Sequence, residues 1–298
     1  MLPIASAALM AACAQQNRVS APSRQVDAVS AAIAARTAQT PDAVVRVVAF
    51  RLDGRGPRIE ILGDSLVHAA STMKVPVLIE LAQESDRGRL SLDEPIPLIN
   101  QFTSIVDGSP YTLSATDDSD DAVHARVGER VPTRWLATRM ITHSSNLATN
   151  VLLTVVRADS VTARARMLGA TRMVVRRGVE DGPAFRAGLN NVTTANDLAA
   201  LMNAIATDRA ASPAACAWMR DVLFAQAYNE SIPAGLPEGT RIAHKTGNIT
   251  RVEHDAAIVY PRGRAPYVLV VLTSGVAQPR DAHRLIADIA GIVHKALR

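Results

Sequence analysis

The chain has 298 residues, of which 48% are hydrophobic and 3% aromatic, and a net charge of +4. It is long and apolar enough to bury a sizeable core, as one large domain or two small ones. The basic residues are spread along the chain, without the basic stripe or interleaved stacking residues typical of nucleic-acid-binding proteins. We therefore expect no nucleic-acid partner.

The chain opens with an apolar run from Met1 that ends in small residues and Cys13. This run resembles the end of a bacterial lipoprotein signal. It predicts a signal segment and linker over residues 1–24, export to the periplasm or cell envelope, and membrane anchoring through a lipid on Cys13. No other stretch is free of charges over the eighteen or more residues that a membrane helix needs. Cys216 would then stand alone, so no intrachain disulfide is expected.

Residues 25–298 predict one mixed α/β (α+β) domain with strands near both ends and helices between them. The hairpin at 43–62 follows from β-branched runs around the turn Gly54-Arg55-Gly56-Pro57. An α/β lobe is predicted from about 25–70 and 215–298, and a helical lobe from about 71–214. The elements expected are helices at about 24–38, within 74–168 and at 281–297, and strands at 43–50, 58–62, 241–245, 256–260 and 267–272.

Two segments of the chain lack clear periodicity. The acidic run Asp117–Asp121 is interpreted as a solvated loop, because it lacks the glycine and distal glutamate of a calcium loop. Residues 169–191 predict a long irregular loop, and loops of this length are usually functional or disordered.

Only three lysines occur in the chain, at Lys74, Lys245 and Lys295. Arginine can replace lysine wherever only a positive charge is needed, but a guanidinium cannot give up its proton in a protein, whereas an amine can. Two of the three lysines stand in short motifs, Ser71-Thr72-Met73-Lys74 and Lys245-Thr246-Gly247. These motifs indicate amine chemistry at a serine acyl-transfer site.

Ser71 precedes a helical run that begins at Lys74, so the two side chains should lie one turn apart on one face. For Lys74 to accept the Ser71 proton, its pKa must fall from about 10.4 to about 7, which costs on the order of 4–5 kcal/mol. Burial and a second ammonium can both lower it. We expect Lys245 to supply that second charge.

A third motif, Ser144-Ser145-Asn146, lies between the other two. With S-x-x-K first, S-x-N second and K-T-G last, the chain resembles the class A β-lactamases and their penicillin-binding relatives over roughly residues 40–275. The resemblance implies an α/β lobe with a five-stranded antiparallel sheet, an all-helical lobe, and an active site between them. Ser145 stands where the family usually has aspartate, a change we expect to be tolerated.

The resemblance also implies the roles of the motif residues. Ser71 matches the nucleophile and Lys74 its activating partner. Ser144 matches the hydroxyl that relays a proton to the leaving nitrogen, and Asn146 the amide that holds the substrate's side-chain carbonyl.

The last motif matches the substrate-binding strand of the family. Lys245, Thr246 and Gly247 correspond to the segment that binds the substrate carboxylate. The backbone N–H groups of Ser71 and Asn248 would form the oxyanion hole.

The chain departs from the family at the glutamate that activates the deacylating water. Class A enzymes carry it in E-x-x-L-N, whereas here Leu189-Asn190 follows Glu180 only after a longer gap. Glu180 is the candidate, because Thr193-Thr194 follows at about the family's distance, and Asp181 is the alternative. An exposed loop carboxylate without a catalytic role is equally compatible with the pattern.

The resulting prediction is a monomeric serine hydrolase that opens β-lactam rings through an acyl-enzyme on Ser71. Two alternatives stay open: a D-Ala-D-Ala peptidase or related amidase acting on a peptidoglycan-like substrate, and a penicillin-binding sensor that stays acylated. No cofactor is expected, and a metal site is disfavoured because the histidines and cysteines show no ligand spacing.

Overall fold

The computed structural model describes residues 21–297. The predicted signal segment, including Cys13, lies outside these residues. Within 21–297, none of the helices combines the length and the apolar character needed to cross a bilayer.

A five-stranded antiparallel sheet forms the centre of the α/β lobe, in the order β2-β1-β11-β10-β9. Both ends of the chain contribute to it, as predicted. The first two strands, β1 and β2, pair as the expected hairpin. The strands are β1 (Val44–Arg51), β2 (Ile59–Ile61), β9 (Arg241–Ile249), β10 (Val252–Tyr260) and β11 (Tyr267–Ser274).

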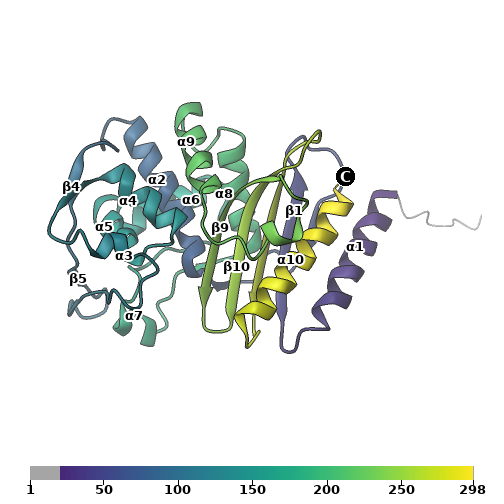
Figure 1. Cartoon of the computed structure of the whole chain (residues 1–298), viewed down its shortest axis with the longest axis horizontal. Helices are drawn as coiled ribbons and strands as arrows, with labels where there is room; N and C mark the ends of the chain where they lie inside the picture. Colours follow the sequence, from purple (N-terminus) through teal and green to yellow (C-terminus); the bar gives the residue numbers. More distant parts are fainter. Residues whose placement is uncertain (1–20, 298) are drawn as a thin grey trace, which may run out of the picture.

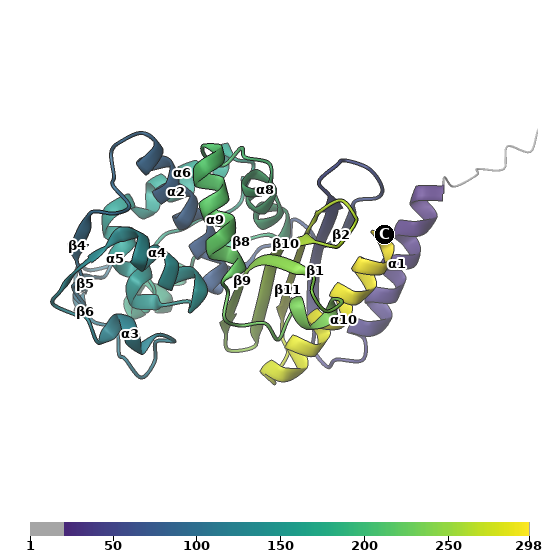
Figure 2. The same cartoon turned by 45° about the horizontal axis from the view of Figure 1, so that its top comes forward.

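Two helices from opposite ends of the chain, α1 (Ala21–Thr37) and α10 (Pro279–Ala296), cover the outer face of the sheet. They lie side by side in Figures 1 and 2. Helix α10 buries Leu285, Ile286 and Ile289 along one side at helical spacing. These side chains pack with alternate strand residues such as Val47 in a hydrophobic cluster.

The inner face of the sheet meets the helical lobe through α8 (Ala195–Ala206), which packs on β1, β10 and β11. Helix α9 (Pro213–Phe224) lies against β9. The rest of the lobe is built around the buried helix α2 (Lys74–Asp86), which packs against α4 (Thr133–Thr142), α5 (Asn146–Val156) and α6 (Ala158–Met167).

Short elements complete the described chain. These are β3 (Val67–His68), η1 (Ala70–Met73), β4 (Pro95–Pro97), β5 (Phe102–Thr103), β6 (Pro110–Tyr111), α3 (Asp121–His124), β7 (Arg130–Pro132), α7 (Gly182–Arg186), β8 (Val192–Thr193) and η2 (Pro233–Gly235).

Two expectations for the loops need correction. The segment 169–191 is not wholly irregular, because Asp181 caps the short helix α7 and Val174 bridges to Val192. The interpretation of 117–121 as a solvated loop is wrong for two of its residues. The Asp118 side chain is fully buried and Asp120 is nearly so, because both accept hydrogen bonds from neighbouring helices.

Candidate active site

Ser71 lies in the 3₁₀ turn η1, which leads directly into α2. The turn begins at Ala70, whose φ of +46° is in the left-handed region. Such a conformation is unfavourable for an L-residue and recurs at functional sites. It lets Lys74, the first residue of α2, bring its Nζ to 3.1 Å from Ser71 Oγ. The predicted serine–lysine pair is therefore formed.

Lys74 is completely buried, and its amine has four oxygen neighbours. Nζ lies 3.1 Å from Ser71 Oγ, 2.6 Å from the Ser144 carbonyl, 3.2 Å from Ser144 Oγ and 2.9 Å from Asn146 Oδ1. Burial lowers the pKa of Lys74 to about 7, although the carboxylates of Asp118 and Glu180 act in the opposite direction. An amine with this pKa can accept the Ser71 proton near neutral pH.

Lys245, on β9, is the second buried amine and shares the Ser144 hydroxyl with Lys74. Its Nζ lies 3.0 Å from Ser144 Oγ and 2.8 Å from the Thr246 carbonyl. Burial, and then the nearby Lys74, lower the pKa of Lys245 well below its ordinary value. Burial is thus the main cause of the lowered pKa at both amines, and the charge repulsion between Lys74 and Lys245 acts in the same direction.

Ser144 joins α4 to α5 in a left-handed conformation, with φ of +57°. For a non-glycine residue this strain costs about 1–3 kcal/mol. It turns both the carbonyl and the hydroxyl of Ser144 toward Lys74. The hydroxyl thus lies between two amines, where it can pass a proton from one side of the site to the other.

Gly247 lets strand β9 approach the nucleophile closely. A Cβ at this position would lie 2.9 Å from the backbone nitrogens of both Ser71 and Thr72. Only glycine fits against that turn without a shift of the backbone. The close approach brings Asn248, the next residue on β9, to the pocket that Ser71 lines, as an oxyanion hole formed by their two N–H groups requires.

Asn146 connects the nucleophile side of the site to the loop carboxylate. Its Oδ1 accepts a hydrogen bond from Lys74, and its Nδ2 donates to Glu180 Oε1 at 3.0 Å. Glu180 has φ of +63°, and partial burial raises its pKa. Despite the changed spacing of the loop, a carboxyl group therefore lies one amide away from Lys74.

Asp181, the alternative loop carboxylate, has a structural role. Its fully buried side chain accepts hydrogen bonds from Ser104 Oγ at 2.7 Å, Ile105 N at 3.0 Å and Ala184 N at 3.1 Å. These contacts cap α7 and attach the loop to the segment after β5. Asp181 is thereby occupied by three donors, which leaves Glu180 as the loop carboxylate that contacts the site, through Asn146.

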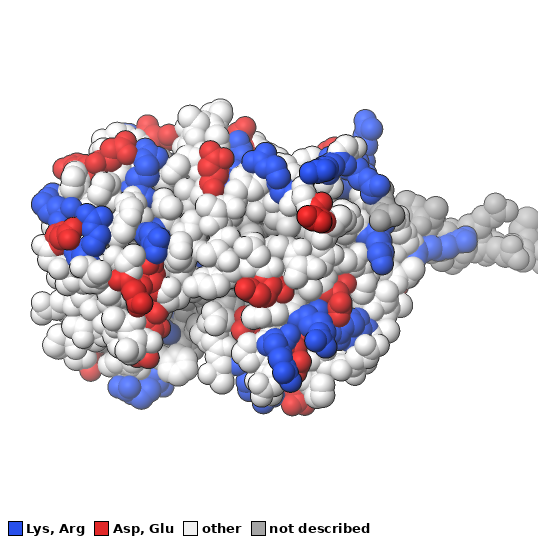
Figure 3. All heavy atoms as spheres, viewed as in Figure 1, with Lys and Arg blue, Asp and Glu red and all other residues white. Residues whose placement is uncertain are grey.

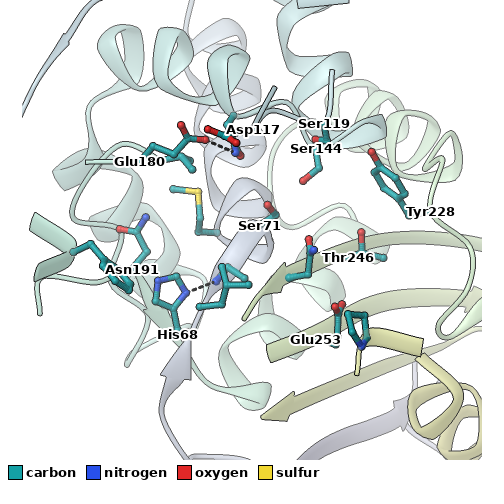
Figure 4. A pocket seen from close by; sticks show the side chains of 18 of the residues that line it. His68, Ser71, Asp117, Ser119, Ser144, Glu180, Asn191, Tyr228, Thr246 and Glu253 are labelled. Carbon is teal, nitrogen blue, oxygen red and sulfur yellow. Dashed lines mark hydrogen bonds between the residues drawn. The ribbon is translucent and has the colours of Figure 1, made fainter. Parts of the chain in front are cut away.

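Residues of both lobes, with Ser71 and Ser144 among them, line a cavity of about 730 Å³. Figure 4 shows Ser71 near its centre, with Glu180 and Asp117 on one side and Thr246 and Tyr228 on the other. Figure 3 shows acidic residues beside the hollow, and those that line it include Asp117, Glu180, Glu230 and Glu253.

Glu253 also lines the cavity, although it belongs to none of the sequence motifs. It is buried on β10, directly opposite Asn248 of β9, and its Oε2 lies 3.3 Å from His283 Nε2. Burial raises the pKa of Glu253 to about 7. The available signal was the run Glu253-His254-Asp255 at the start of a strand that is otherwise apolar. The described residues contain no cluster of His, Cys, Asp and Glu side chains that could hold a metal ion.

Three solved structures illustrate what the chain is similar to. A β-lactamase from Sphaerobacter thermophilus is 27% identical, with a TM-score of 0.77 over 91% of this chain and 97% of that one. PBP-A is 25% identical, with a TM-score of 0.76 over 90% and 95%. A point mutant of PBP-A, described as an acyl-enzyme complex with penicillin G, is 26% identical, with a TM-score of 0.75 over 91% and 96%.

No curated protein sequence matches the chain. The model of the β-lactamase enzyme family matches residues 26–297, nearly the whole chain. Together with the sheet order, the helical lobe and the serine–lysine pair, this match assigns the fold and the class of enzyme. The chain belongs to the β-lactamase enzyme family and is a serine β-lactamase-like hydrolase with the β-lactamase/transpeptidase-like fold.

Proposed function

We propose that this enzyme opens β-lactam rings through an acyl-enzyme on Ser71 and releases the product by hydrolysis. The observation that carries the proposal is the 3.1 Å contact between Ser71 Oγ and a buried Lys74 amine whose pKa is about 7. The acyl-enzyme complex of a PBP-A point mutant with penicillin G, in a similar fold, supports the acylation step.

In the proposed acylation step, neutral Lys74 removes the Ser71 proton as Oγ attacks the lactam carbonyl. The N–H groups of Ser71 and Asn248 stabilise the oxyanion; loss of one such donor typically costs about 2.7–4 kcal/mol. The proton then passes through Ser144 to the leaving nitrogen, because Ser144 Oγ lies within 3.2 Å of Lys74 Nζ. Lys245 and Thr246 bind the substrate carboxylate.

In the proposed deacylation step, Glu180 removes a proton from the water that attacks the acyl group. Its contact with Asn146 places it beside Lys74, and partial burial raises its pKa, which makes the carboxylate a stronger base. Asn146 would have to share its amide between Glu180 and the side-chain carbonyl of a bound substrate.

The second candidate function is a penicillin-binding protein or D-Ala-D-Ala peptidase that forms the same acyl-enzyme. The similarity to PBP-A and the longer gap between Glu180 and Leu189-Asn190 favour it. In either case we propose that the chain is exported and acts at the cell envelope as a monomer. The apolar run that ends at Cys13 supports export and anchoring.

The test follows a chromogenic cephalosporin with wild type, Ser71→Ala, Glu180→Gln and Glu230→Gln, while mass spectrometry records covalent adducts. Glu230 is an exposed acidic residue of the same cavity and serves as the matched control. We expect steady turnover in wild type and Glu230→Gln, none in Ser71→Ala, and accumulation of adduct in Glu180→Gln. A stoichiometric adduct on wild type without turnover would favour the second candidate, and absence of any adduct would reject both.

A further inference from the structure

The acidic loop 117–121 contacts the segment that carries Ser144 and Asn146. At the centre of this contact, the Asp118 side chain is fully buried. Its Oδ1 accepts a hydrogen bond from Asn146 N at 2.9 Å, and its Oδ2 accepts from Leu147 N at 2.9 Å. Oδ2 also lies 3.3 Å from Ser145 Oγ and 3.0 Å from His124 Nε2. Four donors, three from the start of α5 and one from the short helix α3, therefore converge on one carboxylate.

These contacts complete the N-terminus of α5. The first N–H groups of a helix have no partner within it, and the positive end of the helix dipole favours an anion there. Asp118 accepts from the first two, at Asn146 and Leu147, and Ser145 Oγ accepts from the third, at Ala148. Asp118 from the loop and the N-cap residue Ser145 thus cap this helix together.

The neighbouring residues of the loop hold the other side of Ser144. Ser119 Oγ donates to the His143 carbonyl at 2.6 Å, and Asp120 Oδ2 accepts from Arg139 Nε at 2.6 Å. Hydrogen bonds from the loop therefore fix the residues on both sides of Ser144, His143 and Asn146. Between them, Ser144 has a left-handed backbone, and its carbonyl accepts a hydrogen bond from Lys74.

We propose that Asp118 is the positioning residue of the acylation site: its carboxylate fixes Ser144 and Asn146 against Lys74 and supplies, from a separate loop, the carboxylate that the family motif carries where this chain has Ser145. The proposal rests on the proposed acylation of Ser71. It assigns a role to an acidic run that the sequence presents as a surface loop.

The Asp118 carboxylate also acts on Lys74 through its charge. The charged groups that face Lys74 are Lys245 from β9, Glu180 from the 169–191 loop and Asp118 itself. Asp118 and Glu180 favour the protonated amine and thereby oppose the effect of burial. Removal of the Asp118 charge should therefore lower the pKa of Lys74, which loss of packing alone would not do.

The three-lysine composition makes this shift directly measurable. Protein labelled with ¹³C at the lysine ε-carbon gives three resonances, which Lys→Arg variants assign, and exposed Lys295 is the internal reference. In Asp118→Asn, we expect the Lys74 titration midpoint to fall by roughly half a pH unit or more. Asp121→Asn is the matched control, because Asp121 is an exposed carboxylate of the same loop. A Lys74 midpoint no lower than in Asp121→Asn overturns the proposal.

Acylation by penicillin G, followed as adduct per folded molecule, gives the second readout. We expect Asp118→Asn to acylate at least tenfold more slowly than wild type, and Asp121→Asn to match wild type. A loss no larger than that of the control also overturns the proposal. If wild type itself forms no adduct, the proposed function is wrong, but the lysine titration still decides the role of Asp118.

The double variant D118N/S145D places the carboxylate at the position used by the family motif. We expect it to recover the acylation rate to within about fivefold of wild type, together with the Lys74 midpoint. If Asp118→Asn does not fold, the double variant decides alone: a folded protein with a wild-type midpoint supports the proposal, and an unfolded or unrestored one overturns it.

Discussion

The two faces of the central sheet are built on different physical principles. On the outer face, α1 and α10 bury mainly apolar side chains, such as Ile286 and Ile289, against the strands. On the side that faces the helical lobe, two amines, Lys74 and Lys245, are completely buried on either side of the Ser144 hydroxyl. Apolar packing on the outer face stabilises the fold. The side that faces the helical lobe instead holds amines that would be more stable in water. The reactive groups of the acylation site thus lie together where the sheet meets the helical lobe.

The largest expected effect on acylation is that of Lys74→Arg, on the side of the sheet that faces the helical lobe. A guanidinium cannot accept the Ser71 proton, so acylation should fall by roughly 10³-fold or more. Adduct formation per folded molecule measures this effect. Lys295→Arg, at an exposed position of α10, is the control and should leave the rate unchanged. Retention of substantial acylation in Lys74→Arg would show that Lys74 is not the base.

Gly247→Ala tests how closely the backbone of β9 approaches the turn that carries Ser71. The added Cβ would lie 2.9 Å from the nitrogens of Ser71 and Thr72, so strand and turn must move apart. We expect acylation to fall by about 10²–10³-fold, comparable to the loss of one oxyanion donor. Gly263→Ala is a control for stability, because a Cβ there has open space although its φ is positive. An unchanged acylation rate in Gly247→Ala would argue against this oxyanion hole.

Ile289→Val tests the outer face. It removes one buried methylene from the apolar cluster and should lower the free energy of unfolding by about 0.5–1.5 kcal/mol. Urea denaturation measures the loss. Acylation per folded molecule should stay unchanged, because the cluster lies on the face away from the site. If the acylation rate per folded molecule also fell, the packing of the outer face would be coupled to the active site.

The smallest effect is expected for Glu253→Gln, which tests charge at the cavity wall. Burial raises the pKa of Glu253 to about 7, so the group is neutral below that pH and ionised above it. An anionic substrate should therefore bind less well to wild type above about pH 7, by roughly threefold, and Glu253→Gln should remove that loss. The kcat/KM profiles of the two proteins compare this directly, and parallel profiles would contradict it.

The same shift predicts a stability difference with a defined sign. A carboxyl whose pKa is raised in the folded state disfavours folding once it ionises, so the cost is absent near pH 4 and develops fully above pH 7. Glu253→Gln should therefore be more stable than wild type at pH 8, and this advantage should disappear at pH 4. Urea midpoints at the two pH values test this prediction.

The sequence predicted most of the fold, because periodic apolar residues determine it. The hairpin of β1 and β2 and the buried face of α10 follow from side-chain alternation and helical spacing. The three motifs predicted Ser71, Lys74, Ser144 and Lys245 as neighbours, since short patterns that recur in a fixed order specify a known geometry.

The rest of the site depends on contacts between segments that are distant in sequence. The pattern of Asp117–Asp121 is typical of a surface loop, and only the fold brings Asp118 to the start of α5. Asp181 and Glu180 are adjacent in sequence, yet Asp181 caps a helix and Glu180 accepts a hydrogen bond from Asn146 in the site. The one available hint was Ser145, where the family motif has a carboxylate that this chain supplies from elsewhere.

The distribution of the lysines has a practical consequence. Lys74 and Lys245 are completely buried, whereas Lys295 is exposed near the end of α10. It lies twelve residues, or roughly 18 Å along the helix, from His283 at the cavity. Apart from the terminal amine, an amine-reactive reagent should therefore modify the native fold at a single side chain. The enzyme carries a built-in single point for conjugation or immobilisation that leaves its nucleophile accessible.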